Sequence, residues 1–417
     1  MNSELELWLD DAVLAERVVR VGTLVRTTAR GREVLRFRYA PEWLANRKAS
    51  FALDPQLPLT AGDFFPESGG SLFGVLRDLA PDRWGRVLME RREADEARRE
   101  GRAARRLSEW DFLAGVNDVA RLGALRLRDP ATARWIDHRA PGITPLSRLR
   151  ELEAAARELE ADGAAGRSGY SDWLRLLVVP GSCLGGARPK ASFLDSDGSL
   201  WLAKFPASSD RHDVGAWEML AHELALSAGI EVPRARTLAL GGGRRTFCVA
   251  RFDRVGNRRR MYASAMTLLQ REDGDAASYL ELAEVLQLAG DAQRIEADLH
   301  QLYRRIAFSM LIANRDDHLR NHGFLRTPGG WVLAPAFDLH PGSDKPDHLL
   351  AIDETDPRPS LATLRSTARF YRLTDSGAGQ VEREVRSAIA LWPALAQALE
   401  LDAQERAALA SLLAPPL

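Results

Sequence analysis

The chain has 417 residues, more than one hydrophobic core normally serves, so two or three packed subdomains are expected. Hydrophobic residues make up 45% of the chain and charged residues 28%, which excludes a wholly disordered protein. The 57 Lys and Arg residues nearly balance the 58 Asp and Glu residues. This balance disfavours a general nucleic-acid binder, because such proteins usually carry a strong basic excess.

The first third of the chain is expected to mix strands and helices. Alternating leucines at residues 5–9 and strand-forming residues at 34–39 predict strands. A helix is expected over 71–79, and a second from Pro81 onward, because proline suits the first turn of a helix. The charged tract at 90–106 is interpreted as a solvated helix face rather than an arm that binds nucleic acid.

The rest of the chain is expected to place a small mixed lobe before a largely helical lobe, which is the order of a protein kinase fold. The elements expected here are a helix over 146–159, strands at 191–194 and 200–204, a helix over 214–228, strands near 236–240 and 246–251, helices over 279–288 and 295–312, a strand at 331–333 and two helices after Gln380. Proline and glycine punctuate residues 130–142, so the predicted subdomains are 1–140, 141–262 and 263–417.

Two cysteines, Cys183 and Cys248, are too few for a disulfide framework or a cysteine-rich zinc site, and they suit a reducing compartment. The N-terminal residues lack the pattern of a signal peptide, and no apolar stretch approaches the length that spans a bilayer. A cytoplasmic protein with no membrane partner is therefore expected.

The segment 314–321 carries the most informative motif. Protein kinases place a catalytic Asp and a metal-binding Asn with four residues between them, and Asp316 and Asn321 have this spacing. Asp338 follows a predicted hairpin, where a second oxygen ligand for Mg²⁺ is expected. Asp317 is the alternative to Asp316, but its distance in sequence from Asn321 does not fit. Alone, such a cluster is more often a solvated loop or a helix cap, so the interpretation needs the other motifs.

Two upstream motifs could act on phosphate. Lys204 is expected at the end of a strand, as the phosphate-pairing lysine of kinases is, and Glu218 on the next helix could orient it. The loop 181–190 is not a Walker A sequence, but its glycines allow close backbone approach to phosphate. The loop residues that could contribute are Gly185, Gly186, Ala187, Arg188 and Lys190. Each feature alone is more often an ordinary surface residue or turn.

Together these motifs resemble the HipA family, the kinase toxins of bacterial toxin–antitoxin modules. The resemblance covers nearly the whole chain and includes residues 39–44, 185–190, 251–254, 264–267 and the segment from Asn314 to Asp338. It implies an α+β fold in which a mixed N-terminal subdomain packs on a protein-kinase-like core with a largely helical C-terminal lobe.

The resemblance also implies roles for single residues. Asp316 would accept the proton of the substrate hydroxyl, Asn321 and Asp338 would bind Mg²⁺, and Lys204 would contact the phosphates of ATP. The nucleotide pocket would be lined by Ala250, Phe252, His318 and Phe337. A capping or core histidine is the alternative interpretation of His318.

The resemblance implies a Ser/Thr protein kinase that acts as a toxin, with ATP and Mg²⁺ as cofactors. The implied substrate is an aminoacyl-tRNA synthetase, whose modification would arrest growth. The implied partner is a HipB-like helix-turn-helix antitoxin, through which operator DNA would be bound. The alternatives are a kinase of another substrate, such as a small metabolite, and a co-repressor or binding module with a vestigial nucleotide site. Direct DNA binding would be a minor, partner-assisted role.

One position departs from the family pattern, in which a serine of this loop is autophosphorylated and the enzyme is then inactive. Cys183 stands at that position, with Ser182 just before it, and a thiol is not an equivalent acceptor of phosphate. We therefore expect self-inactivation to be absent or to use Ser182. Mass spectrometry of the protein after incubation with Mg·ATP checks this expectation. Stoichiometric phosphate elsewhere on the loop, with loss of activity, would refute the Ser182 version.

Overall fold

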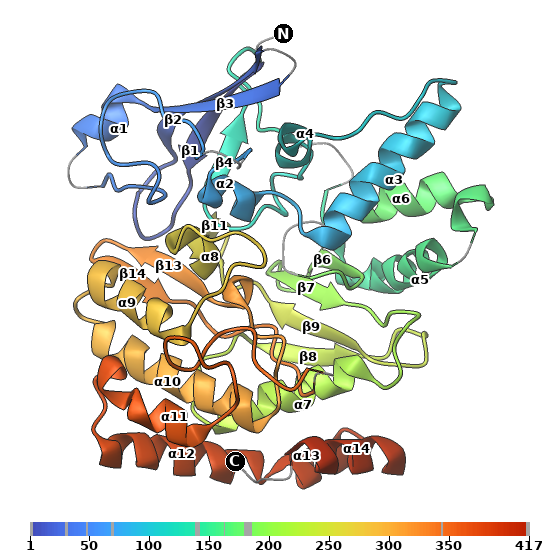
Figure 1. Ribbon diagram of the computed structural model, residues 1–417. Coiled ribbons are helices and arrows are strands. Elements are labelled where there is room, and N and C mark those ends of the chain that lie inside the picture. The colour runs from blue at the N-terminus through green and yellow to red at the C-terminus, as the bar shows by residue number, and fades with distance from the viewer. Residues whose placement is uncertain are drawn as a thin grey trace. The chain divides into compact units, whose positions relative to one another are not determined.

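The computed structural model describes residues 3–29, 32–46, 49–67, 71–137, 142–161, 163–178, 186–342 and 345–413. The chain divides into two compact units (Figure 1): the first is Met1–Ser209, Leu240–Gly243 and Asp253–Ala263, and the second is Asp210–Ala239, Arg244–Phe252 and Ser264–Leu417. Within the described ranges, no helix combines the length and the apolar composition that crossing a membrane requires. The predicted subdomain boundaries near residues 140 and 262 stay predictions.

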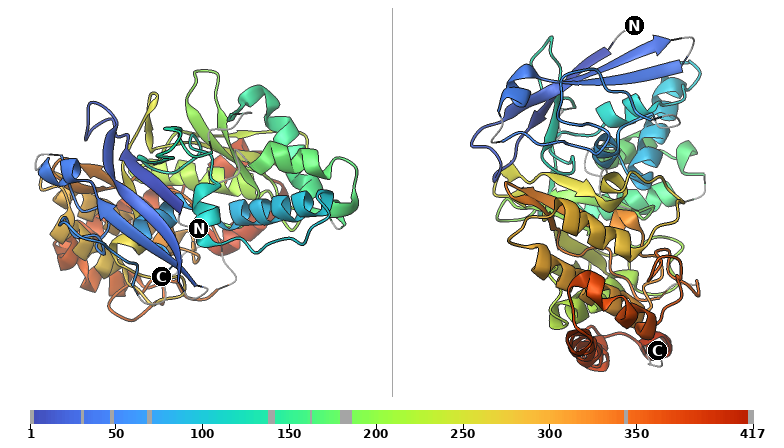
Figure 2. Two further views of the ribbon diagram at one scale, coloured as in Figure 1. Left: turned by 90° about the horizontal axis from the view of Figure 1, so that it is seen from above. Right: turned by 60° about the vertical axis from the view of Figure 1, so that its left-hand side comes forward.

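The first unit begins with an antiparallel sheet whose strands lie side by side in both views of Figure 2. Its strands are β1 (Ser3–Leu9), β2 (Val19–Ala29), β3 (Arg32–Tyr39) and β4 (Leu125–Arg128), in the order β3-β2-β1-β4. Leu5, Leu7 and Leu9 are 5%, 1% and 1% exposed, so the alternating side of β1 faces the core. Both strands predicted in this region are thus confirmed.

The helices of the first unit are α1 (Pro41–Ala45), α2 (Gly74–Leu79), α3 (Arg83–Arg99), α4 (Glu109–Ala114), α5 (Leu149–Glu160) and α6 (Tyr170–Val178), with 3₁₀ turns at Leu146–Arg148 and Ala164–Gly166. The expectation that a helix begins at Pro81 is wrong. Asp82 is the N-cap of α3, because its Oδ1 accepts a hydrogen bond from the backbone N–H of Gly85 at 2.8 Å. Pro81 therefore precedes the cap, and α3 starts two residues later than predicted.

The charged tract at 90–106 is only partly solvated. Glu93 and Asp95 on α3 are 6% and 7% exposed. The chain after α3 folds back, so that Glu93 accepts hydrogen bonds from the Arg102 side chain (2.5 Å) and the Arg105 backbone N–H (3.0 Å). The hydrogen bond from Arg102 is the largest influence and lowers the pKa of Glu93 to about 2.

The short strands of the first unit are β5 (Thr144–Pro145), β6 (Lys190–Leu194), β7 (Leu200–Lys204), β10 (Arg254–Val255) and β11 (Arg258–Arg259), while β12 (Tyr262–Ser264) ends at the unit boundary. Strands β6 and β7 are antiparallel, and β5 is parallel to β6. In this register Lys190 lies directly opposite Lys204. The two strands predicted at 191–194 and 200–204 are confirmed.

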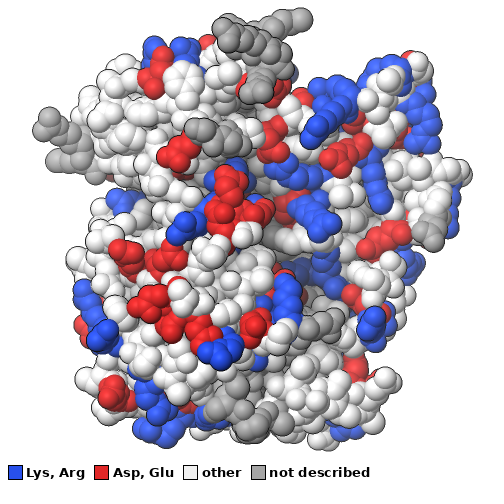
Figure 3. Space-filling view, viewed as in Figure 1, with Lys and Arg blue, Asp and Glu red and all other residues white. Residues whose placement is uncertain are grey.

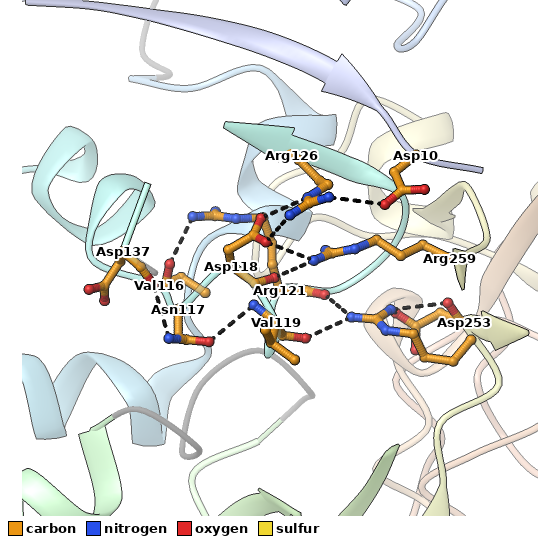
Figure 4. A network of polar contacts seen from close by, with 11 residues as sticks. Asp10, Val116, Asn117, Asp118, Val119, Arg121, Arg126, Asp137, Asp253 and Arg259 are labelled. Carbon is orange, nitrogen blue, oxygen red and sulfur yellow. Dashed lines mark hydrogen bonds and ion pairs between the residues drawn. The ribbon is translucent and has the colours of Figure 1, made fainter. Parts of the chain in front are cut away.

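A buried network of charges holds three distant segments of the first unit together (Figure 4). Asp118 is 4% exposed and accepts hydrogen bonds from Arg126 (2.5 and 3.1 Å) and Arg259 (3.2 Å). Arg126 also pairs with Asp10 at 3.1 Å. Burial acts to raise the pKa of Asp118, but the charges of Arg259 and Arg126 outweigh it and lower that pKa.

Asp253 and Arg254, which belong to the motif at 251–254, extend this network. The backbone N–H of Gly123 donates to Asp253 Oδ2 at 2.7 Å. Arg254 donates to the Asp253 carboxylate (2.5 Å) and to the carbonyl oxygens of Val119 (3.0 Å) and Arg121 (2.7 Å). This half of the motif therefore fixes the loop at 119–123, which is a structural role.

The second unit is mainly helical. Its helices are α7 (Val214–Ser227), α8 (Ala265–Leu268), α9 (Tyr279–Ala289), α10 (Ile295–Leu311), α11 (Leu361–Ser366), α12 (Asp375–Ile389), α13 (Trp392–Ala398) and α14 (Ala403–Leu413), with 3₁₀ turns at Leu319–Asn321 and Ala368–Tyr371. Its strands form two antiparallel pairs, β8 (Ala235–Leu238) with β9 (Thr246–Ala250), and β13 (Gly323–Thr327) with β14 (Gly330–Leu333).

Helix α10 lies at the core of the second unit, where α9 and α12 pack against it (Figure 1). Tyr303 and Phe308 of α10 are fully buried, and the Tyr303 hydroxyl donates to Glu382 of α12 at 2.9 Å. The two helices predicted after Gln380 are confirmed as α13 and α14, whereas α12 begins before Gln380, at Asp375, where Thr374 caps it. Helix α11 was not predicted.

Replacement of Asp118 with Asn should destabilise the first unit, because the buried guanidinium group of Arg259 and the partly buried one of Arg126 would lose the negative charge of Asp118. Breaking a buried ion pair on one side costs about 3–5 kcal/mol in the free energy of unfolding. Urea unfolding of the full chain measures this loss. The matched control is Asp172→Asn, since Asp172 pairs with Arg175 at 2.9 Å but its side chain is 67% exposed. Equal unfolding midpoints for the two variants would contradict the assignment.

Candidate active site

The segment 314–321 follows the C-terminus of α10 directly. Ala313 has a positive φ of 57°, so the chain leaves the helix through a left-handed residue. The backbone N–H of Asn314 then donates to the carbonyl of Ser309 at 2.9 Å. The buried helix therefore fixes where the segment begins, as was predicted for a loop at a helix end.

Within this segment, the side chain of Asn321 contacts the backbone of Asp316. The side chain of Asp316 is 66% exposed, whereas Asn321 is 9% exposed. Asn321 Nδ2 donates to the backbone carbonyl of Asp316 at 3.2 Å, and the Asn321 N–H donates to the carbonyl of His318 at 2.8 Å. The amide thus closes the loop with its nitrogen, and its oxygen stays available as a ligand. The arrangement leaves a carboxylate in solvent on a loop of fixed shape.

Asp317, the alternative to Asp316, has a different role. It is 4% exposed, and Tyr279 Oη donates to its carboxylate at 2.7 Å. His322 Nε2 lies 2.9 Å from Asp317 Oδ1, and Ser309 Oγ is a third partner at 3.4 Å. Burial acts to raise the pKa of Asp317, but His322 and the hydroxyl of Tyr279 outweigh it, so that pKa is lowered. Asp317 is therefore an anchor for the segment rather than a group open to substrate.

The chain after Asp338 runs along the same segment. Lys345 Nζ pairs with Asp316 Oδ1 at 2.8 Å, and Arg315 Nη1 donates to His348 Nε2 at 2.7 Å. A histidine that accepts through Nε2 must be neutral. Burial and the charge of Arg315 lower the pKa of His348 to about 4, against the opposing influence of Asp317.

The β13–β14 hairpin lies between the two predicted metal ligands in the chain. The backbone N–H of Ala334 donates to the carbonyl of Gly323 at 2.9 Å, so the two open ends of the hairpin lie together. Asn321 comes two residues before this end, and Asp338 comes four residues after it. Asp338 has a positive φ of 59°, an uncommon conformation for a residue with a side chain.

Four residues of the second unit were predicted to line a nucleotide pocket. Ala250 ends β9, and the rings of Phe252 and Phe337 stack with their centroids 5.4 Å apart. His318 Nδ1 is buried and has no hydrogen-bond partner among the described residues. A buried polar atom without a partner costs free energy, so a ligand that supplied one would be favoured.

Glu218 is 5% exposed on α7, whose N-terminus is held by Asp213. Asp213 Oδ1 accepts hydrogen bonds from the backbone N–H groups of Ala216 and Arg245, each at 3.1 Å. Gly215 is required here, because a Cβ atom would lie 2.1 Å from the Arg245 carbonyl oxygen. These contacts fix the direction of the helix that carries Glu218.

In the first unit, Lys204 is the last residue of β7, as predicted. Lys190 is 1% exposed; its ammonium pairs with Asp82 Oδ2 at 2.8 Å and donates to the Gly186 carbonyl at 3.1 Å. Gly186 has a positive φ of 87°. The Lys190 ammonium therefore binds the protein itself at the exit of the loop.

Arg188 Nε donates to the carbonyl of Phe205 at 3.0 Å, and Ala187 is exposed. Ser182, Cys183 and Gly185 lie outside the described residues, so their predicted roles stay predictions.

The donor set suits a hard cation better than a transition metal. Among the residues that the structure describes, no group of three or more His, Cys, Asp and Glu side chains is arranged to hold a metal ion. Mg²⁺ does not need such a cage, because one or two protein oxygens suffice when phosphate and water complete its shell. Asn321 and Asp338 offer oxygens of that kind.

The sequence did not reveal five residues that support the segment: Tyr279, Arg315, His322, Lys345 and His348. Arg315 and His322 are polar neighbours of Asp316 and Asn321, which is a weak signal, and the other three residues carry no local signal.

The comparisons with known proteins agree over most of the chain. Family models match residues 12–125, as the HipA N-terminal domain, and residues 182–399, as the HipA-like C-terminal domain. No curated protein sequence matches the chain.

Among solved structures, the chain is similar to HipA of Shewanella oneidensis MR-1, from a complex with HipB and its operator DNA. The TM-score is 0.65 at 18% identity, over 98% of this chain and 96% of that one, which shows a shared α+β fold. A Helicobacter pylori proinflammatory kinase, CtkA, matches 51% of this chain and 94% of its own at 13% identity. Its TM-score of 0.32 is too low to carry an argument.

The bond between Arg315 and His348 should make the protein sensitive to mild acid. A histidine whose folded pKa is about 4, against about 6.5 when unfolded, stabilises the fold fully above pH 6.5. This contribution is lost as the pH falls from 6.5 toward 4. The stability advantage of wild type over His348→Gln should therefore shrink across this range in urea unfolding. Histidine NMR gives an independent check: a His348 resonance that titrates near 6.5 would contradict the assignment.

Proposed function

Because the chain belongs to the HipA family, we propose that it is an ATP-dependent protein kinase that transfers the γ-phosphoryl group to a Ser or Thr hydroxyl. The observation that carries the proposal is the arrangement of Asp316 and Asn321. An exposed carboxylate and a buried amide lie on one short loop, with the amide nitrogen bonded to the carbonyl of Asp316 itself.

Asp316 would act as the acceptor of the substrate proton. Its carboxylate is open to solvent, so a protein hydroxyl can approach within hydrogen-bond distance. Asp317 supports this role by holding the adjacent backbone through Tyr279 and His322. Catalysis of phosphoryl transfer is mainly positioning and charge stabilisation, so a rigid support for the carboxylate is what the reaction requires.

Mg²⁺ would be held by Asn321 and Asp338. Bound there together with ATP, it would neutralise the charge that develops on the phosphate oxygens. The amide nitrogen of Asn321 is occupied by the carbonyl of Asp316, which supports the use of its oxygen as the ligand.

In the second unit, the base of ATP would lie against the stacked rings of Phe252 and Phe337. Lys204 of the first unit is proposed as a phosphate contact on the family resemblance alone. Lys190 and Lys204 are directly opposite each other on one face of the β6–β7 pair, and both are at least nine-tenths buried. The Lys190 ammonium is neutralised by Asp82, so Lys204 is the lysine of this pair that we propose for the phosphates. The buried Nδ1 of His318, which has no hydrogen-bond partner among the described residues, supports a nucleotide in the second unit.

The proposed biological role is that of a toxin. The Shewanella HipA chain was solved with HipB and operator DNA, so we propose a HipB-like helix-turn-helix antitoxin as partner here. Operator DNA would be bound mainly through this antitoxin. Figure 3 shows basic and acidic side chains interspersed over the face in view, and the net charge is -1, which fits an indirect DNA contact. An aminoacyl-tRNA synthetase in the cytoplasm is the proposed substrate.

Replacement of Asp316 with Ala should abolish growth arrest when the protein is expressed in bacteria. Loss of a general base lowers a rate by about 10²–10⁴-fold, so phosphate transfer from labelled ATP to lysate proteins should fall accordingly. The control is Asp172→Asn, an equally exposed aspartate that also forms an ion pair, and it should behave as wild type. Equal growth on expression of wild type and Asp316→Ala would contradict the kinase-toxin proposal.

A further inference from the structure

Arginine is far more frequent than lysine in this chain. The sequence contains 53 arginines but only four lysines: Lys48, Lys190, Lys204 and Lys345. An ordinary surface ion pair can be formed by either residue, so in this chain it would be expected to use arginine. A lysine in such a chain draws attention to what a compact ammonium on a flexible stem could do at that position. Three of the four lysines lie in described segments that the proposed function uses or adjoins.

Lys345 contacts the proposed proton acceptor directly. Its Nζ lies 2.8 Å from Asp316 Oδ1, and the two side chains are 50% and 66% exposed. A pair this exposed contributes little to the stability of the fold. A structural role therefore does not explain why this position holds one of the four lysines.

The chain segment that carries Lys345 is held in place by His348. Three residues later, His348 accepts a hydrogen bond from Arg315, the neighbour of Asp316. The backbone N–H of His348 also donates to the carbonyl of Pro357 at 2.9 Å, and His348 is 4% exposed. Residues 345 and 348 therefore contact two consecutive residues of the catalytic segment. The buried His348 anchors this chain segment and so keeps the Lys345 ammonium beside the Asp316 carboxylate.

We propose that Lys345 is a further catalytic residue of the phosphoryl-transfer site, an inference that rests on the proposed function. In the step, the substrate O–H bond breaks and its proton passes to Asp316. The hydroxyl oxygen bonds to the γ-phosphorus, and the bond from that phosphorus to the leaving ADP oxygen breaks. Lys345 keeps its protons throughout. Its ammonium holds the Asp316 carboxylate toward the hydroxyl and contacts the oxygens of the phosphoryl group in transfer.

The reach of the side chain fits this role. The attacking hydroxyl must lie within about 3 Å of Asp316, and the phosphorus about as far beyond it. An ammonium that already contacts Asp316 is thus within one side-chain rotation of the phosphoryl oxygens. Charge that develops on those oxygens in the transition state would be met by a cation that is already in place.

Kinetics of three variants test the proposal. Lys345→Ala should lower kcat by about 100-fold, as the loss of one charge-stabilising donor does, with the KM for ATP within about threefold of wild type. Lys345→Arg should restore part of kcat, because it keeps the charge with a different shape. The matched control is Arg358→Ala, which removes a 76%-exposed arginine that pairs with Asp356 at the same 2.8 Å and should leave kcat unchanged.

Chemical labelling gives a readout that does not require turnover. With four lysines in the chain, modification by an amine reagent can be followed at each lysine by mass spectrometry. A non-hydrolysable ATP analogue with Mg²⁺ should protect Lys345 several-fold relative to the protein without nucleotide.

The outcomes separate the two proposals. An active wild type with Lys345→Ala as active as Arg358→Ala would overturn the role of Lys345 and leave the kinase proposal intact. Protection of Lys345 without phosphate transfer by wild type would overturn its part in catalysis. Neither transfer nor protection would overturn both proposals.

Discussion

Asp317 carries a charge that the fold has removed from water, and it must therefore be surrounded by groups that stabilise its ionised form. Tyr279 at the start of α9, Ser309 in α10 and His322 just before β13 supply these groups. Because they come from three separate elements, the segment 314–321 is fixed with respect to all of them. The exposed position of Asp316 depends on this support, because the backbone of Asp316 cannot move without moving that of Asp317.

Adjacent aspartates thus divide two tasks that conflict. A carboxylate that anchors must be dry and fully hydrogen-bonded, whereas one that takes a proton from a substrate must be reachable. Side chains of successive residues in this segment point into different surroundings, so both demands are met one residue apart. Asn321 adds the closing bond to the carbonyl of Asp316, and Arg315 ties the segment to His348. The same short stretch therefore serves as support, loop closure and reactive group.

Short-range features could be predicted from the sequence, whereas long-range partners could not. The alternating leucines of β1 are a local pattern that was placed correctly, and the segment with Asp316 and Asn321 follows a helix as predicted. The roles of these two residues stay predictions. The start of α3 was predicted at Pro81 because proline is common there, but the side chain of Asp82 forms the cap. The burial of Glu93 could not be foreseen, because its partners Arg102 and Arg105 come from the chain that returns after the helix ends.

The other contacts that were not predicted involve residues distant in sequence. Lys190 stays a predicted contributor to phosphate binding, but the sequence did not reveal that its ammonium pairs with Asp82, 108 residues earlier in the chain. Likewise, neither Lys345 nor His348 belongs to a motif, and only the path of the chain after Asp338 brings them to the catalytic segment. Such contacts depend on tertiary packing, which leaves no periodic signal in a single sequence.

Asp82 uses its two carboxylate oxygens for two unrelated purposes: Oδ1 starts α3, and Oδ2 neutralises Lys190. Evolution at this position is therefore constrained from two sides. An asparagine would keep the cap but lose the charge, and a glutamate would keep the charge but is a poor cap because its side chain is longer. A change that either task alone would tolerate is thus excluded by the other. Positions 82 and 190 should vary together across evolution or stay unchanged.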